Sequence, residues 1–417
     1  MRISMKNKLP VMFLIFWITT TAVLAGAPVQ PGDRIAIVGN TFADQLRIHG
    51  YLETLLLQYT ADKPVSIRNL GWGGDMLTAR DRPTNFPSEE ETLTAHRTDV
   101  IIACFGLGES FAGEERIAAF KSDLQAFIAS HAGKKYNGKS EVRLVLVSPI
   151  AYEDLGDITP AKEKRNRELA AYTRAMGEVA SDAHVPFVDL YTPSLYLMND
   201  PTGPNLTTNG IHLNRYGYWA MGKSFFDQLT VSNQMHGHEP WRLAIDAEAA
   251  TASARGVKIS EVETSDTAVI FMVTETSTPS LPPPTDQPLP PQMQFNRDTL
   301  RVERLKPGMY QLAVDDQRVA SATAEVWAAG VPIDSSPAHH AAEKLRAAIN
   351  DKNLQFTYSW KALNQVHIVG ERRTSPSGKE LPREVIESSE LANQRDSTLH
   401  RAIELKARRW RISRIEK

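Results

Sequence analysis

The sequence contains a single cysteine, Cys104, among 417 residues. One cysteine cannot form an intrachain disulfide, and without a Cys-x-x-Cys pair no zinc-finger or dithiol redox site is available. An excess of one charge is also missing, because 47 Lys and Arg face 49 Asp and Glu, a formal net charge of −2. A chain with no basic excess is not expected to bind nucleic acid. Internal repeats and a phosphate-binding glycine loop are absent as well.

Long hydrophobic runs are scarce, and the clearest lies at the N-terminus. Basic residues from Arg2 to Lys8 precede an apolar run at 11–18, and small residues follow at 22–27. This order is typical of a secretory signal peptide, which we predict over residues 1–27. The alternative is a membrane anchor, but the apolar span is shorter than the roughly 20 residues that a bilayer requires. We therefore expect cleavage, a secreted or periplasmic location, and no membrane span afterwards.

Removing this segment changes the charge of the protein. Three basic residues leave with it, so 44 positive groups face 49 negative ones and the mature charge is about −5. The near-neutral balance of the full chain therefore hides a mildly acidic mature protein.

The first half of the chain alternates short apolar runs with amphipathic stretches. We expect buried strands at 34–38, 65–70, 99–105, 142–147 and 187–190, and helices at 41–58, 117–127, 169–179 and 221–229. Apolar strands that alternate with helices predict a parallel sheet covered on both faces. In such sheets the ligand site lies beyond the carboxyl ends of the strands.

Four short blocks stand at those places. They read Gly39-Asn40-Thr41 after the first strand, Asn69 to Asp75 after the second, Gly106 to Gly113 after the third, and Asn209 to His212 before the last helix. Their order and spacing resemble the SGNH (GDSL-like) hydrolases, and most closely a group of secreted bacterial SGNH-type proteins. The resemblance implies a three-layer α/β/α, flavodoxin-like domain over residues 32–230.

The resemblance also assigns roles to residues. It implies Thr41 as nucleophile, His212 as general base, Asn209 as the residue that orients the base, and Gly74, Gly108 and Asn40 as the oxyanion hole. Three of these positions depart from the family pattern, because Thr41 replaces serine, Asn209 replaces aspartate and Gly108 replaces asparagine. Acyl transfer needs an activated hydroxyl, an oriented base and donors aimed at the oxyanion. Each substitution weakens one of these three requirements.

Two functions follow from this pattern. The first is an exported ester hydrolase that cleaves acyl or acetyl esters of a small molecule or a carbohydrate. The second is a catalytically impaired relative that binds a glycan or a protein partner in the old active-site cleft, with Trp72, Phe111 and Tyr152 as candidate lining residues. Thr41 also has a structural alternative as the N-cap of the following helix. We expect no cofactor, no metal site and no nucleic-acid partner, and the oligomeric state stays open.

The second half carries no comparable motif. We expect a β-rich region at 235–335, with strands at 267–273 and 310–314, a hairpin partner at 319–327, and a proline-rich loop at 279–291. His236 and His238 have the spacing of a metal pair, but a solvated linker is the favoured interpretation. Residues 336–417 are expected to be mainly helical, with an extended aromatic run from Phe356 to Trp360. The basic stretch from Arg401 onward is interpreted as a solvated helix end rather than a contact with an anionic surface.

Overall fold

The computed structural model describes residues 27–415, except 84–85, 157–158, 160–161, 231–238, 277, 285–296, 365–373 and 404. The predicted signal peptide, His236, His238 and the second half of the proline-rich loop lie outside the described residues. Within those ranges, no helix has the length and apolarity needed to cross a bilayer.

A five-stranded parallel sheet forms the centre of the first half, in the order β2-β1-β3-β4-β5. Its strands are β1 (Arg34–Gly39), β2 (Ser66–Asn69), β3 (Val100–Cys104), β4 (Arg143–Val147) and β5 (Phe187–Val188). Cys104 is buried at the end of β3, and burial raises the pKa of its thiol. The cysteine is therefore a packing residue rather than a reactive one.

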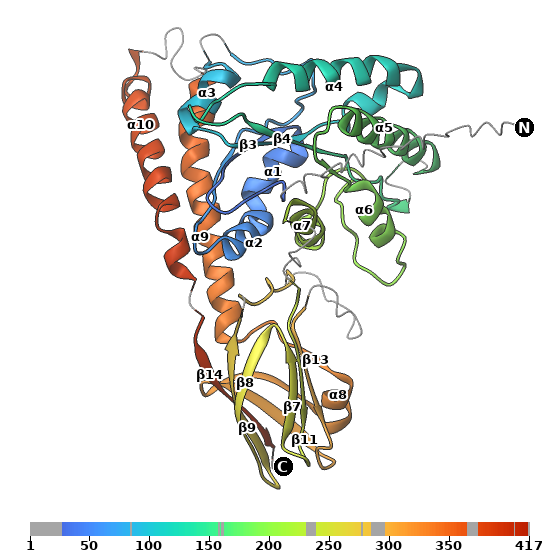
Figure 1. Cartoon of the computed structure of the whole chain (residues 1–417), viewed down its shortest axis with the longest axis vertical. Helices are drawn as coiled ribbons and strands as arrows, with labels where there is room; N and C mark the ends of the chain where they lie inside the picture. Colours follow the sequence, from blue (N-terminus) through green and yellow to red (C-terminus); the bar gives the residue numbers. More distant parts are fainter. Residues whose placement is uncertain are drawn as a thin grey trace, which may run out of the picture.

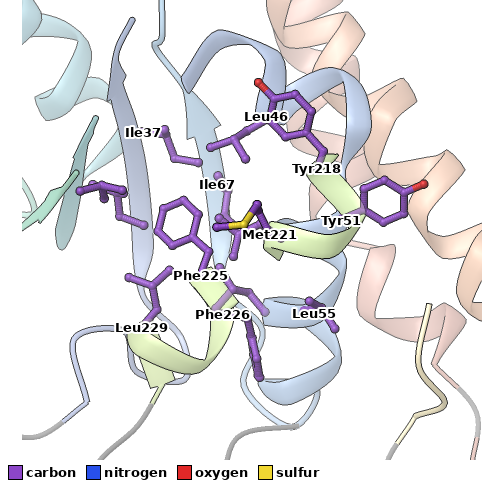
Figure 2. Close-up of a cluster of buried hydrophobic side chains, with 14 of the residues drawn as sticks. Ile37, Leu46, Tyr51, Leu55, Ile67, Tyr218, Met221, Phe225, Phe226 and Leu229 are labelled. Atoms are coloured by element: carbon purple, nitrogen blue, oxygen red, sulfur yellow. The ribbon is translucent and has the colours of Figure 1, made fainter. Parts of the chain in front are cut away.

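Helices cover both faces of this sheet (Figure 1). They are α1 (Thr41–His49), α2 (Tyr51–Tyr59), α3 (Glu89–His96), α4 (Ile117–His131), α5 (Lys162–Asp182), α6 (Tyr191–Met198) and α7 (Arg215–Thr230). One core lies between the sheet and α1, α2 and α7, and the other lies between the sheet and α4 and α5. Figure 2 shows the first core, where Met221, Phe225 and Phe226 of α7 meet Ile37 and Ile67 of the sheet. The expected three-layer α/β/α architecture is confirmed.

The helix expected over 41–58 is interrupted at one residue. Gly50 takes a φ of +68° and separates α1 from α2. A Cβ at this position would lie 2.2 Å from Asn350 Oδ1, so a side chain here would displace that of Asn350 as well as strain the backbone at this φ. The absence of a side chain at Gly50 allows residues 346 and 350 of a C-terminal helix to pack closely against the junction of α1 and α2.

The second half contains two packed β-sheets. The first has the order β13-β10-β6-β7 and the second has the order β12-β11-β14-β9-β8. The strands are β6 (Arg242–Asp246), β7 (Thr251–Arg255), β8 (Val257–Thr264), β9 (Ala268–Glu275), β10 (Thr299–Glu303), β11 (Met309–Val314), β12 (Gln317–Thr323), β13 (Val331–Pro332) and β14 (Ala407–Arg414), with helix α8 (Ala324–Ala329) after β12. The expected hairpin across residues 315–317 is present as β11 and β12, but the partner strand expected over 319–327 ends at Thr323, and residues 324–327 belong to α8. Trp327, Trp410 and Phe271 lie in the core between the sheets.

The C-terminal segment connects the two halves. Helices α9 (Pro337–Trp360) and α10 (Pro376–Asp396) run side by side along the first half and return the chain to the β-sheets (Figure 1). Arg346 donates to the carbonyl of His49 at 2.7 Å, and buried Lys352 pairs with Glu53 of α2. The chain then ends as β14, the central strand of the five-stranded sheet.

Two expectations for this segment are wrong. The aromatic residues at 356–360 are helical, because the spacing of Phe356 and Trp360 fits the i, i+4 period of a helix as well as the alternation of a strand. The basic stretch is not a helix end, because Trp410 and Ile412 alternate inward from β14 into the core. The many basic side chains in this segment, most of them at outward positions of β14, made the alternation of buried and exposed residues hard to recognise in the sequence.

Candidate functional site

Thr41 lies at the carboxyl end of β1, where the strand passes directly into α1. Asn40 is the N-cap, since its Oδ1 accepts a hydrogen bond from the Phe42 N–H at 3.0 Å. Thr41 is therefore the first helical residue, and its alternative role as the N-cap is wrong. Its hydroxyl makes no hydrogen bond to any residue that the structure describes. The half-buried hydroxyl therefore has no hydrogen-bond partner among the described residues.

The loop after β2 lies against this hydroxyl. Asn69 fixes the loop by donating to Ala43 O at 2.7 Å and accepting from the Gly71 N–H at 2.9 Å. A Cβ built on Gly73 would lie 3.7 Å from Thr41 Oγ1, whereas one built on Gly74 would meet nothing within 4 Å. The N–H groups of Gly73 and Gly74 have no acceptor among the described residues. Two unoccupied backbone donors therefore lie in the loop beside the Thr41 hydroxyl.

The position of the missing oxyanion asparagine is filled by another residue. A Cβ at Gly108 would lie 2.7 Å from Met76 Cγ and 2.9 Å from Met76 Sδ. Met76 is held by reciprocal backbone hydrogen bonds with Ala79, at 3.1 and 3.2 Å. A thioether thus occupies the space where the family pattern places an amide donor. Nothing in the sequence near Gly108 signalled this contact.

The neighbours of Gly108 do not replace that donor. Glu109 accepts from the N–H groups of Leu77 and Gly106, both at 2.8 Å, and burial raises the pKa of its carboxyl group. The hydroxyl of buried Ser110 donates to Leu107 O at 2.7 Å. Both side chains serve to join loops. Asn40 is also buried, and its carbonyl oxygen is used by the helix cap.

His212 and Asn209 meet in the loop before α7. Asn209 Oδ1 accepts from the N–H groups of His212 at 3.0 Å and Ile211 at 3.3 Å, so its Nδ2 faces the ring and lies 3.0 Å from His212 Nδ1. An amide nitrogen donates, so Nδ1 must accept and the ring proton must lie on Nε2. Burial also lowers the pKa of His212, which favours the neutral ring. This tautomer is the opposite of the one a general base requires.

Glu153 holds the histidine loop in place. Its carboxylate accepts from the N–H groups of Leu206 at 2.8 Å and Thr207 at 2.6 Å, and also from the Thr207 hydroxyl. The Glu153 N–H donates to Gly210 O at 3.0 Å. Sequence reasoning missed this residue because its partners lie more than 50 positions away.

The loop of His212 and the start of α1 are joined through α7. The Tyr218 hydroxyl donates to Phe42 O at 3.1 Å, and the two rings are stacked with centroids 5.7 Å apart. Between the Thr41 hydroxyl and the His212 ring, both within the described ranges, no hydrogen bond is formed. The elements meet at one end of the fold, but the side chains of Thr41 and His212 are not hydrogen-bonded to each other.

The three aromatic residues proposed as cleft lining have different environments. Trp72 is half-buried, with Arg82 4.7 Å and Lys361 5.0 Å from its ring centroid. Phe111 is 62% exposed and stacks on the guanidinium of Arg165 at 3.8 Å. Tyr152 is buried beside Leu107 and packs under Gly210. Phe111 is therefore exposed, the Trp72 ring also packs against Phe86 and Trp360, and Tyr152 supports the histidine loop.

The ion pairs of two carboxylates near Trp72, those of Asp75 and Asp44, were also not foreseen. Asp75 binds Arg82 through both oxygens, at 2.8 and 2.6 Å. Asp44 of α1 accepts from Arg47 at 3.0 Å and from Lys361 at 2.5 Å, and these contacts outweigh burial and lower the pKa of its carboxyl group. Lys361 follows α9, so the C-terminal segment reaches the edge of the site. Across the described ranges, no cluster of three or more His, Cys, Asp or Glu suited to a metal was found.

This geometry defines a three-layer α/β/α domain with a hydroxyl at the end of its first strand and a histidine before its last helix. Residues 32–220 match the model of the GDSL-like lipase/acylhydrolase family. No sequence among the curated proteins matches the chain.

Solved structures share the fold at low sequence identity. A gut microbial diltiazem-metabolizing enzyme aligns with a TM-score of 0.66 and 16% identity, over 93% of this chain and 99% of its own. Similarity of this extent includes the β-sheets and C-terminal helices as well as the hydrolase domain. An acetylxylan esterase from Geobacillus stearothermophilus aligns at 16% identity, a TM-score of 0.38, and 49% and 97% coverage of the two chains.

Proposed function

We propose that the chain is an exported ester hydrolase that cleaves acyl or acetyl esters, with an esterified carbohydrate as the favoured substrate class. The observation that carries the proposal is the free Thr41 hydroxyl beside the unoccupied N–H groups of Gly73 and Gly74. The matched family supports ester cleavage. Export rests on the signal-like sequence at 1–27.

The proposed reaction is acyl transfer in two stages. Thr41 Oγ1 attacks the ester carbonyl while His212 accepts its proton, and the resulting oxyanion is bound by the N–H groups of Gly73 and Gly74. Collapse of this intermediate expels the alcohol, which takes the proton from His212. Water then hydrolyses the acyl-threonine by the same route and releases the acid.

Two features make this reaction slow. His212 carries its proton on Nε2, so the ring must exchange tautomers before it can act as a base. Met76 leaves no room for a side-chain donor at position 108, a loss of about 3 kcal/mol in transition-state stabilisation where such a donor has been removed. We therefore expect turnover well below that of a Ser-His-Asp enzyme.

The test is hydrolysis of p-nitrophenyl acetate by the purified chain, beside Thr41→Val and His212→Ala. Thr41→Val keeps the shape of the side chain and removes the hydroxyl. Both variants should fall to the buffer rate while keeping the circular-dichroism spectrum of the parent. Equal rates in all three proteins would refute the nucleophile and base assignments. Thr41→Ser should raise kcat, because serine lacks the methyl group that restricts χ1.

The second candidate function is binding without turnover. The Asn209 amide orientation and the position of Met76 favour it, since both remove catalytic interactions but leave the surface open. In this case the parent and both variants hydrolyse nothing, Thr41→Ser stays inert, and an acetylated xylo-oligosaccharide binds to the chain in calorimetry. Binding that is lost in Trp72→Ala would place the ligand at this site.

A further inference from the structure

The C-terminal basic stretch is used in the fold in a way that the hydrolase site does not explain. β14 is a central strand, paired with β11 on one side and β9 on the other. Trp410 and Ile412 are fully buried between the two sheets, so Arg409 and Arg411 extend from the opposite, solvent-facing side. A third arginine, Arg318 of β12, lies on the same face, because its partner Ala313 pairs with Arg411.

The guanidinium groups of these three arginines form no ion pair, although the Asp315 carboxylate accepts from the Arg409 backbone N–H at 3.0 Å. Arg409, Arg411 and Arg318 are exposed, and none forms an ion pair with a described residue. Arg408 shows the contrast, since it is buried and its guanidinium pairs with Asp315 at 3.0 Å. One carboxylate, Glu263 of β8, lies two strands away from Arg411, because Glu263 pairs with Ile270 of β9 and Ile270 pairs with Arg411. The part of the face nearest β14 is therefore positively charged.

Common structural reasons for exposed arginines do not cover this arrangement. Charged side chains often protect edge strands from aggregation, but β14 is not an edge strand. Solubility is also an insufficient reason, because the mature chain is acidic overall, at about −5 once residues 1–27 are removed. This face is positively charged although the mature chain as a whole is negatively charged, and such a local excess of positive charge is typical of an anion-binding surface.

We infer that this face of the five-stranded sheet, defined by Arg318, Arg409 and Arg411, binds an anionic polysaccharide through its carboxylate or sulfate groups. Guanidinium groups match the planar geometry of such anions and are more weakly hydrated than ammonium groups. Residues two apart on a strand are about 6.8 Å apart, so Arg409 and Arg411 contact successive anions along a chain. The strand neighbours of these arginines are half-buried apolar residues: Ala313 and Ile270 pair with Arg411, and Met272 pairs with Arg409.

A polysaccharide is favoured over nucleic acid because the outward positions of these five strands carry no aromatic residue on which a base would stack. Membrane binding is less favoured, since the face is a flat sheet without an amphipathic helix to insert. The inference does not depend on turnover at Thr41, and its test uses no catalytic readout.

The experiment measures binding of the full chain to polygalacturonate at about 50 mM salt, beside neutral dextran, a DNA duplex and anionic phosphatidylglycerol vesicles. The test variant is Arg409→Gln/Arg411→Gln. Its matched control is Arg167→Gln/Arg174→Gln, which removes two exposed arginines from α5. The test variant should bind polygalacturonate at least about tenfold more weakly, with a salt slope reduced by about two, while the control keeps parental binding. Dextran should not bind.

Three results would overturn the inference. These are no binding to polygalacturonate, equal loss in the test and control variants, or tighter binding to DNA or vesicles that depends on Arg409 and Arg411. Because both side chains are exposed, the melting temperature of the test variant should stay near that of the parent. If it does not, Arg318→Gln on β12 gives the same comparison without changing the central strand.

Discussion

The side-chain nitrogen of Asn209 faces His212 Nδ1 at 3.0 Å, and this contact decides the protonation of the ring. The amide cannot turn over freely, because its oxygen already accepts two backbone N–H groups of the same loop. A residue that was expected to orient a base therefore holds that base in its inactive tautomer.

Replacing Asn209 by aspartate should restore the base. The carboxylate keeps the two backbone hydrogen bonds and accepts a hydrogen bond from the Nδ1–H of His212, which leaves Nε2 unprotonated. We expect kcat for p-nitrophenyl acetate to rise between tenfold and about 10,000-fold. Asn209→Ala removes the orienting contact without adding a charge, so its kcat should not rise above that of the parent. Equal rates for the two variants would contradict this account of the tautomer.

The contact between Met76 and Gly108 predicts a coupled effect of two substitutions. Gly108→Asn alone should lower thermal stability, because its Cβ would lie within 3 Å of the Met76 side chain. Gly108→Asn combined with Met76→Ala should recover that loss and supply an oxyanion donor, raising kcat on the order of 100-fold over Met76→Ala alone. A double-mutant cycle of melting temperature and kcat measures the coupling. Strict additivity would show that Met76 does not exclude the asparagine.

The loop anchored by Glu153 should depend on its carboxylate. Glu153→Gln leaves buried donors of Leu206 and Thr207 imperfectly paired, so we expect the free energy of unfolding to fall by about 1–3 kcal/mol. Urea denaturation measures this change. Glu141→Gln, at an exposed position, is the control and should change stability by less than about 0.5 kcal/mol. A test variant as stable as the control would mean that the loop is held by other contacts.

Lys352 predicts how firmly the C-terminal helices are attached. Its ammonium group is fully buried, pairs with Glu53 and donates to Ile67 O at 3.0 Å. Lys352→Met removes the charge but keeps the stem, leaving the Glu53 carboxylate without its cation, and should cost about 3–5 kcal/mol in urea denaturation. Lys344→Met, at an exposed position of the same helix, should be near neutral. A small loss in both would show that α9 does not contribute to the stability of the first half.

His49 predicts a loss of stability in acid. Burial, with Arg346 and Arg215 nearby, lowers the pKa of His49 from 6.5 to about 4. Between pH 6.5 and 4, His49 is protonated in the unfolded chain but neutral in the folded chain. The free energy of unfolding therefore decreases as the pH falls through this interval. His49→Phe keeps a ring stacked on Tyr218, whose centroid lies 4.4 Å away, and should show a smaller decrease in urea midpoint over that interval. Parallel curves for the two proteins would contradict the assignment.

The sequence by itself determined the sheet and the location of the site. Apolar runs such as 34–38 and 99–105 are expected to be buried in any fold, because removing apolar surface from water is favourable whatever the neighbouring residues are. The glycines that follow them mark where the chain leaves the sheet. Thr41 and His212 were predicted as site residues because their neighbours in the chain carry the pattern.

Tertiary structure decided what those residues are able to do. The Asn209 amide is oriented by backbone donors, the space at Gly108 is taken by a methionine 32 positions earlier, and Glu153 acts on a loop more than 50 positions away. Strand β14 is the clearest case, since its outward arginines conceal a period that only pairing with β9 and β11 reveals. Such contacts join residues distant in the chain, and no local pattern of residue types records them.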